Sequence, residues 1–424
     1  MKDKTLCFYD SGMFIELAIT LSKSFGRVLY FSDWVSEYPI SQDDRIGDGV
    51  PGLERISDFF EVVYDADNKF NVDIYCFPSI YHGWLQIFLR DKLGKRVWGS
   101  GLGDELERWR LQANKAFAKL GLPRPTMIEI EGMKSLRAHL KTVEDKYIKV
   151  SEYRGSGETW HHENYELSEP ILDEMAHELG KEQEVFKWLV EDPINDAIEV
   201  GTDIPNCIDG MFPTKTIQGV EDKDCAYACV VKDYADISPL ITDFNKAVAP
   251  LLKKYKYRNF MSTEIRVGKD KVPYMIDFTA RYPSPPGEIY LELISNLAEM
   301  IWYGAEGILI EPKFAAKYAI EVMINSEWAE NKWQTINFPP EVRQWVKLRN
   351  LAIINGTYCV IPRYKDFANI GAVVSIGNTL EECEKKANDI ADKIKGYGVV
   401  VKTASIERIK KTISKAEKLG IKFD

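Results

Sequence analysis

The chain of 424 residues carries 55 basic and 65 acidic side chains, which gives a formal net charge of −10, and its apolar content is 45%. These ordinary values exclude a disordered or fibrous chain, and at about 100–200 residues per domain the length predicts two or three globular domains. The negative charge disfavours a protein whose affinity rests on neutralising duplex phosphates, and it favours small-molecule partners.

Cysteine usage and hydropathy indicate a cytoplasmic protein without a membrane span. The seven cysteines are an odd number and form no disulfide framework, and Cys225 and Cys229 lack a second pair at zinc-finger spacing. The N-terminus has no apolar signal core, and the apolar run Ile80–Leu89 is interrupted by polar residues and a glycine. We therefore expect reduced, mostly buried thiols.

The first hundred residues alternate strand and helix patterns. Apolar runs predict strands at Thr5–Tyr9, Val28–Phe31, Phe60–Tyr64, Val72–Phe77 and Arg96–Gly99, with helices at Met13–Phe25 and Tyr81–Leu93. This order predicts a parallel, doubly wound α/β sheet. Asp10, Ser11 and Gly12 stand where a glycine-rich phosphate turn would be, so we expect no dinucleotide site there.

A lysine at a strand end and a glycine-rich loop follow in the middle of the chain. Asp104 is expected to cap a helix at Glu105–Leu120, and a strand at Lys146–Val150 leads into the loop with Gly155, Ser156 and Gly157. The backbone N–H groups of such a loop can surround phosphates, and Lys149 can add a point charge. The alternative is an ordinary turn beside a solvated lysine.

Two acidic residues flank the next passage. Helical patterns cover Gly132–Leu140 and Glu169–Leu179, and the second leads into the apolar passage Val185–Val190. Strands are expected at Ala197–Thr202 and Ala226–Lys232, with loop at Lys215–Asp224 and a helix at Ile237–Tyr255. Glu191 and Glu199 can accept hydrogen bonds from ribose hydroxyls or bind a metal, or they can simply be hydrated.

A β-hairpin carries the strongest functional signal. Strands at Phe260–Val267 and Val272–Phe278 are joined by a Gly-Lys-Asp-Lys turn. With Val267 facing Val272 across the turn, Glu264 lies opposite Met275. Period two then puts Asp277 and Thr279 on the face of Glu264. Two carboxylates on one surface repel each other unless a cation lies between them, one of them is protonated, or water screens both. The alternative is an exposed hairpin whose acids pair with Arg266 and Arg281.

The remainder reads as a smaller α+β unit behind an apolar helix at Ile289–Tyr303. Strands are expected at Tyr318–Ile324, Thr357–Pro362 and Ala372–Ile376, with helices at Thr379–Lys395 and Ser405–Leu419. Thr379 begins a capping box, and the basic last helix is interpreted as a solvated face.

Together these segments resemble the ATP-grasp ligases, and more narrowly phosphoribosylamine-glycine ligase. The resemblance rests on NKAFAKLGLPRP, on YIKVSEYRGSG, on the two acids Glu191 and Glu199, and above all on STEIRVGKDKVPYMIDFTARYPSPPGE. The stretch NIGAVVSIGNTLEECEKKANDIADKI resembles the C-terminal domain of that family. The resemblance implies a pre-ATP-grasp α/β domain at 1–102, a two-lobed ATP-grasp domain at 103–312 and a small C-terminal α+β domain at 313–424.

The resemblance also implies ATP and Mg²⁺ or Mn²⁺ as cofactors, and it assigns roles to particular residues. For the nucleotide these are Lys115, Lys149, Gly155, Ser156, Gly157, Glu191 and Glu199; for the metal Glu264, Asp277 and Thr279; for catalysis Glu264, Asp277 and Arg281; for the substrate Arg154, Lys215 and Glu288.

The chain departs from that family at three places. Asp277 and Thr279 stand where the family usually has Glu and Asn, and the positive charge of the loop, Arg154, precedes the glycines. The family's Gly-Gly-Met-Gly stretch is absent, and Thr216–Tyr227 occupies its region. We therefore expect an amine other than phosphoribosylamine, or one that is held differently.

The expected activity is that of an ATP-dependent carbon–nitrogen ligase. It would activate a carboxylate, such as that of glycine, as an acyl-phosphate and join it to a small or nucleotide-like amine, releasing ADP and phosphate, with no covalent nucleophile. A modified nucleobase is an alternative acceptor. A catalytically inactive ATP-binding scaffold or sensor is the alternative function, favoured by Thr279 and the altered loop. A monomer or homodimer is expected.

Overall fold

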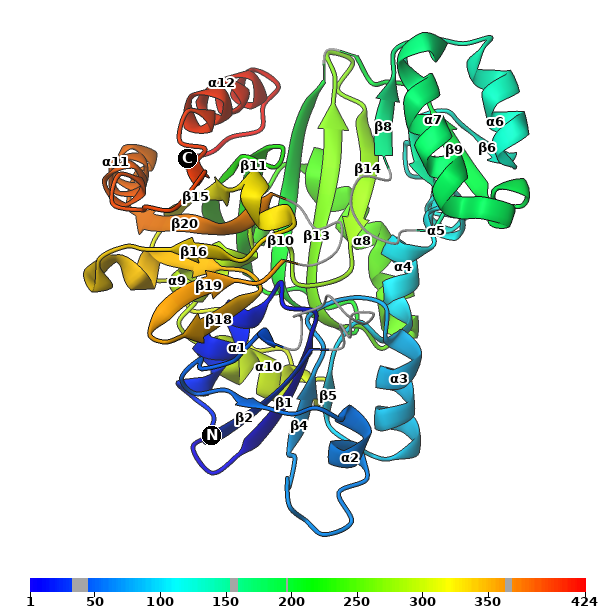
Figure 1. Ribbon diagram of the computed structural model, residues 1–424. Coiled ribbons are helices and arrows are strands. Elements are labelled where there is room, and N and C mark those ends of the chain that lie inside the picture. Colours follow the sequence, from blue (N-terminus) through cyan, green and yellow to red (C-terminus); the bar gives the residue numbers. More distant parts are fainter. Residues whose placement is uncertain (33–44, 153–158, 196, 363–367) are drawn as a thin grey trace.

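The computed structural model describes residues 1–32, 45–152, 159–195, 197–362 and 368–424. Within these ranges the strands form a parallel sheet, a small antiparallel lobe, a long antiparallel sheet and a three-stranded sheet (Figure 1). The mixed α/β and α+β architecture predicted from the sequence is confirmed.

The N-terminal sheet has five parallel strands in the order β3-β2-β1-β4-β5. Its strands are β1 (Thr5–Asp10), β2 (Arg27–Ser32), β3 (Glu54–Arg55), β4 (Ile74–Cys76) and β5 (Val97–Trp98), and its helices are α1 (Ile15–Ser22), α2 (Phe59–Val63) and α3 (Gly83–Ile87), which continues as a π-helix at Phe88–Lys92. The strand predicted at Phe60–Tyr64 is wrong. The side chain of Asp58 accepts hydrogen bonds from the N–H groups of Phe60 and Glu61, which starts a helix there instead.

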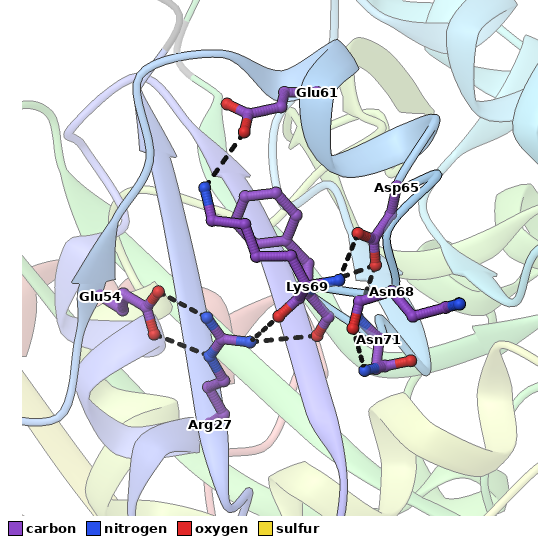
Figure 2. Close-up of polar contacts among 8 residues, drawn as sticks. Arg27, Glu54, Glu61, Asp65, Asn68, Lys69 and Asn71 are labelled. Atoms are coloured by element: carbon purple, nitrogen blue, oxygen red, sulfur yellow. Dashed lines mark hydrogen bonds and ion pairs between the residues drawn. The ribbon is translucent and has the colours of Figure 1, made fainter.

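Polar contacts hold the short edge strand β3 in place (Figure 2). Arg27 on β2 donates to both carboxylate oxygens of Glu54, at 2.7 and 2.6 Å. The same guanidinium donates to the carbonyls of Lys69 and Phe70. Asp65 accepts from three successive backbone N–H groups beginning at Lys69. These bonds fasten the loop before β4 to the edge of the sheet.

A small lobe follows in the chain and stands beside β14 in Figure 1. Its strands, in the order β6-β9-β7-β8, are β6 (Met127–Glu131), β9 (Lys187–Glu191), β7 (Lys146–Val150) and β8 (Thr159–His162), and its helices are α6 (Met133–Leu140) and α7 (Tyr165–Leu179). The lobe has its own core of buried apolar residues, including Leu136, Ile148 and Trp188. It is reached through α4 (Glu105–Arg108) and α5 (Arg110–Lys119), which follow a 3-10 turn at Gly101–Asp104.

The long sheet connects the middle of the chain to its C-terminal part. Its order is β14-β13-β10-β11-β12-β15-β20-β17, with β21 beside β15. The strands are β10 (Ile198–Ile208), β11 (Lys215–Asp222), β12 (Ala226–Asp233), β13 (Arg258–Val267), β14 (Pro273–Thr279), β15 (Tyr318–Asn325), β17 (Val346–Leu348), β20 (Asn369–Gly377) and β21 (Val400–Val401). Because β12 pairs with β15, this sheet crosses the predicted domain boundary at residue 312.

The remaining described elements are five α-helices, short 3-10 helices and the three-stranded sheet. The helices are α8 (Pro239–Lys254), α9 (Gly287–Leu293), α10 (Leu297–Gly304), α11 (Leu380–Ala391) and α12 (Ser405–Lys418). Short 3-10 helices lie at Gly180–Glu184, Tyr234–Asp236, Glu327–Glu330 and Pro340–Trp345. The three-stranded sheet consists of β16 (Gln334–Ile336), β19 (Thr357–Val360) and β18 (Leu351–Ile354), in that order. Thr379 caps α11 as predicted, accepting from the N–H of Glu382.

Four further predictions of local structure need correction. The expected loop at Lys215–Asp224 is largely strand β11, paired on both sides. The expected helix at Glu105–Leu120 breaks at Trp109, and the one at Ile289–Tyr303 divides into α9 and α10. Asp104 makes no cap bond to α4; its carboxylate accepts from the N–H of Gly83 at 3.1 Å.

Two general features complete the fold. The cysteines form no disulfide, and all except Cys225 are buried. Among the described residues, no helix combines the length and the apolar character needed to cross a bilayer.

Candidate functional site

A cavity of about 1230 Å³ lies where the parts of the chain meet. Its wall includes Ser11 and His82 from the N-terminal part, Lys149 from the small lobe, Glu264 from the long sheet and Arg349 from the C-terminal part. Concave sites at the junction of domains are where small ligands commonly bind. The cavity is therefore the candidate site.

The β13–β14 hairpin brings two carboxylates together on the cavity wall. Glu264 lies directly opposite Asp277. The predicted register, with Glu264 opposite Met275, is wrong for two reasons: Val267 pairs with Pro273 and not with Val272, and the ladder contains a bulge. Ile265 pairs with Met275, so Ile276 is the extra residue on β14. The bulge makes the two acids a direct cross-strand pair, whose side chains share one face.

Lys149 lies between acids of the lobe and of the hairpin. It is the next-to-last residue of β7, and its side chain is only 6% exposed. Its Nζ lies 3.1 Å from Oε2 of Glu191 on β9 and 3.6 Å from Oδ2 of Asp277. Burial lowers the pKa of Lys149, but the carboxylates of Asp277 and Glu191 outweigh it and raise the pKa above its ordinary value. This buried ammonium therefore stays charged at the junction of the two sheets.

Further carboxylates surround the hairpin pair. Burial raises the pKa of Glu264 well above its ordinary value, and the charges of Glu199, Asp277 and Glu221 add to the effect. Burial and the charge of Glu199 raise the pKa of Glu221 to about 8. Glu199 itself accepts from Nε of Arg266 at 3.0 Å. The crowded acids make this wall of the cavity a favourable place for an added cation.

The hairpin residues fit a magnesium ion that is shared with phosphate groups. Mg²⁺ is commonly bound by one or two carboxylates together with substrate phosphates and water. Glu264 and Asp277 supply two carboxylates, and Thr279, at the end of β14, lines the same cavity. Among the described residues, no group of three or more His, Cys, Asp and Glu side chains is arranged to hold a metal ion by itself. The donor set therefore suits a metal completed by a nucleotide.

Arg281 is positioned by an acid from α4. Its Nε donates to Oε1 of Glu107 at 2.9 Å, and Oε2 of Glu107 accepts from the N–H of Ala280 at 2.7 Å. Arg281 also lines the cavity, with 16% of its side chain exposed. One carboxylate thus fixes both the backbone and the guanidinium just after β14, which places a positive charge on the cavity wall.

Comparison with solved structures finds matches that span nearly the whole chain. Phosphoribosylamine-glycine ligase from Thermotoga maritima is 15% identical, with a TM-score of 0.62, and the match covers 94% of this chain and 98% of that chain. L-amino acid ligase from Bacillus licheniformis is 15% identical, with a TM-score of 0.61 and coverage of 93% and 99%.

A third match is the biotin carboxylase domain of 2-oxoglutarate carboxylase from Hydrogenobacter thermophilus, solved with MgADP, ADP and bicarbonate. It is 13% identical, with a TM-score of 0.67 and coverage of 99% and 98%. The chain has the ATP-grasp fold. No protein-family model and no curated protein matches the sequence. The resemblance inferred from the sequence is therefore confirmed for the ATP-grasp fold, which these matches show without specifying a substrate.

The cavity described above contains several of the predicted residues. Those on its wall are Lys149, Glu191, Glu199, Glu264, Asp277, Thr279 and Arg281. The predicted loop residues Arg154, Gly155, Ser156 and Gly157 lie outside the described residues.

Three predicted residues are not on the cavity wall. Lys115 is 64% exposed on α5, with its Nζ 3.6 Å from Glu129. Lys215 is exposed at the start of β11, 4.0 Å from Asp233. Glu288 is buried on α9, where it accepts from a cavity residue, Arg349. The structure brings none of the three into direct contact with the cavity, and their roles stay predictions.

The same cavity also includes residues that the sequence analysis did not identify. Arg110, Ala113, Asn114 and Phe117 line it from α5. Their spacing of i, i+3, i+4 and i+7 marks one helix face, so the periodicity contained the signal for Arg110 and against Lys115. Glu221 and Arg349 had no comparable signal, because tertiary pairing alone brings them to the cavity.

Proposed function

We propose that this protein is an ATP-dependent carboxylate–amine ligase that forms an amide through an acyl-phosphate. The observation that carries the proposal is the arrangement of Lys149 between Glu191 and Asp277, with Glu264 paired across the hairpin from Asp277. A buried cation beside a pair of acids suits a nucleotide polyphosphate with its metal. The ATP-grasp fold of the chain supports this interpretation.

In this proposal the nucleotide lies between the small lobe and the long sheet. Lys149 contacts its phosphates. Glu191, the last residue of β9, accepts hydrogen bonds beside the adenine or ribose. Glu199 lies near the ribose or the metal. The solved biotin carboxylase domain with MgADP supports ATP and Mg²⁺ as the ligands.

Glu264 and Asp277 would hold Mg²⁺, with Thr279 as a further oxygen donor. When bound, the metal neutralises charge on the phosphate oxygens during transfer. Arg281, oriented by Glu107, donates hydrogen bonds to the transferred phosphoryl group, and Lys149 stabilises charge on the departing ADP. A carboxylate oxygen of the substrate attacks the γ-phosphorus and ADP leaves. The amine then attacks the acyl carbon, phosphate leaves, and the amine proton passes to solvent.

The acid we propose is an amino acid such as glycine, and the acceptor is a small or nucleotide-like amine. Two of the solved structures with this fold are named as a glycine ligase and an L-amino acid ligase, which supports this class of acid. We expect an acceptor other than phosphoribosylamine, or one that is held differently, because Thr216–Tyr227, on β11 and the start of β12, replaces the family's Gly-Gly-Met-Gly stretch in the sequence.

The test is ADP formation by the purified protein with ATP and Mg²⁺, across a panel of amino acids with and without candidate amines. Asp277→Asn removes one metal ligand and should lower the rate by about 10²–10³-fold. The matched control is Asp243→Asn, because Asp243 is exposed on α8 and, within the described part of the chain, has its ion pair with Lys246 on the same helix. This control should keep the wild-type rate.

ADP release that depends on one amino acid and is lost in Asp277→Asn would establish the ligase activity. Full activity of Asp277→Asn would overturn the assignment of the site. Nucleotide binding without ADP release across the whole panel would favour the alternative of a non-catalytic ATP-binding protein.

A further inference from the structure

Arg349 is a buried cation at the part of the cavity wall that the C-terminal segment supplies. It follows β17 directly, and 8% of its side chain is exposed. Its backbone N–H donates to the carbonyl of Ile370 on β20 at 2.9 Å, so the residue is fixed to the long sheet. Its side chain lines the cavity together with Ser284, Pro285 and Pro286.

The bonds of Arg349 orient its guanidinium and leave part of it available. Nε and Nη2 each lie 3.0 Å from Oε1 of Glu288, and Nη2 also donates to Oγ of Ser284. Among the described residues, these contacts leave Nη1 with no hydrogen-bond partner. A guanidinium presents its five N–H donors in a rigid plane, so fixing two nitrogens also fixes the direction of the third.

Ser284 supplies a second donor next to this nitrogen. Because its Oγ accepts from Arg349, its own hydroxyl proton is free to point elsewhere, and Ser284 is on the cavity wall. Ser284 lies three residues after Arg281, and both line the same cavity. The Ser284 hydroxyl therefore lies on the chain segment that carries Arg281, the arginine assigned to the transferred phosphoryl group, while Arg349 reaches it from the C-terminal part.

A second buried acid, Glu321, lies close enough to the Arg349–Glu288 pair to interact with it electrostatically. Oε2 of Glu288 and both carboxylate oxygens of Glu321 are buried without a hydrogen-bond partner. Burial raises the pKa of Glu321 well above its ordinary value, and the charge of Glu288 adds to this effect.

We propose that Arg349 and Ser284 bind an anionic group, a carboxylate or a phosphate monoester, of the substrate that is not ATP. Glu288 is a positioning residue that acts through Arg349. An arginine fork with an adjacent hydroxyl is well suited to the oxygens of either group. The identity of the substrate rests on the proposed function, whereas the anion site itself stands on these contacts alone.

The test is a calorimetric titration of malonate and, separately, of methyl phosphate into protein saturated with Mg²⁺ and a non-hydrolysable ATP analogue. The analogue fills the phosphate positions of the nucleotide, so a further anion must bind elsewhere. Arg349→Met should weaken binding of the preferred anion by about 10–100-fold, as expected for loss of a charge-assisted hydrogen bond. Ser284→Ala should weaken it by a smaller factor.

Matched controls are available on the same chain. Arg343→Met removes an arginine that pairs with Glu16 at 2.9 Å, and Ser295→Ala removes a hydroxyl that donates to the carbonyl of Lys313. Neither residue lines the cavity. Both controls should bind the anion as the wild type does. If Arg349→Met does not fold, Ser284→Ala and Arg349→Lys decide the outcome, since each keeps the buried packing.

Preference for malonate would identify a substrate carboxylate, and preference for methyl phosphate would identify a phosphorylated acceptor; both support the site. Unchanged binding in the Arg349 and Ser284 variants, or no binding of either anion to the wild type, would overturn it. Absence of ADP release from the wild type would instead count against the proposed function, because the titration does not depend on turnover.

Discussion

Two buried clusters of charged side chains in this molecule differ in how their charges are matched. The interdomain cluster joins the N-terminal part, α9 and the C-terminal part and consists of Glu16, Glu292, Arg343 and Lys347. Arg343 pairs with Glu16 at 2.9 Å, and Lys347 pairs with Glu292 at 2.6 Å. Each acid therefore has a base beside it.

The cavity cluster is unbalanced. Its members are Lys149, Glu191, Glu199, Glu221, Glu264, Arg266 and Asp277. The charges of Arg124 and Lys223 also act on its acids, without an ion pair to any of them in the described part of the chain. Among the described residues, Lys149 and Arg266 pair with three of the acids, while Glu221 and Glu264 have no ion pair. In the interdomain cluster, each acid is already paired with a base of the protein. The excess acids indicate a cluster that is completed by a cation from outside.

Removing the lysine of each cluster should separate stability from activity. Lys149→Met and Lys347→Met each leave a buried carboxylate without its cation, and we expect a loss of about 3–5 kcal/mol in the free energy of unfolding for both. Only Lys149→Met should also lower the rate of ADP release per folded molecule, by about 10²–10³-fold. Denaturant unfolding and steady-state rates at equal folded concentration provide the comparison. Equal rates for the two variants would contradict the distinction.

Asp104 is an intermediate case, because the nearest cation does not fully offset the effect of burial on its carboxylate. Arg108 lies 3.9 Å away, and burial raises the pKa of Asp104 to about 6. The folded state then keeps a proton that the unfolded state loses near pH 4. Stability should fall by up to about 3 kcal/mol as the pH rises from 4 to 6. Asp104→Asn keeps an oxygen acceptor for Gly83 and should flatten this part of the pH profile. An unchanged slope in chemical unfolding from pH 4 to 6 would show that Asp104 does not titrate in this way.

The local parts of the site could be predicted from the sequence. The strand that ends near Lys149 and the two strands of the hairpin follow from periodicity, and the structure reproduces them closely. The pairing of Glu264 with Asp277 could not be predicted, because the turn Gly268–Lys271 does not fix the register and a bulge shifts it.

Long-range contacts account for what the sequence left undetermined. Arg349 approaches Ser284 through contacts between α9 and the C-terminal strands, and no periodic pattern links residues 65 positions apart. The helix at Phe59–Val63 was mistaken for a strand because a five-residue apolar run does not distinguish the two, and its Asp58 cap was the overlooked signal. Lys115 was assigned by motif, whereas its position on α5 points it away from the residues that line the cavity.

Glu264→Gln is the substitution with the smallest expected change in stability. It tests whether the acids of the cavity cluster repel one another in the ligand-free protein. Removing a carboxylate from the unbalanced cluster relieves repulsion, so the ligand-free protein should gain about 1 kcal/mol. Glu16→Gln is the matched change in the interdomain cluster. It should lower stability, because Arg343 loses its charged partner.

The most direct measurement of the central claim is the melting temperature of wild type and Glu264→Gln, with ADP and with or without Mg²⁺. If the excess acids serve a metal–nucleotide complex, Mg²⁺ with ADP should raise the melting temperature of the wild type markedly more than ADP alone. Glu264→Gln should start from a higher value and lose most of the Mg²⁺-dependent increase. An equal Mg²⁺-dependent increase in both proteins would contradict the account.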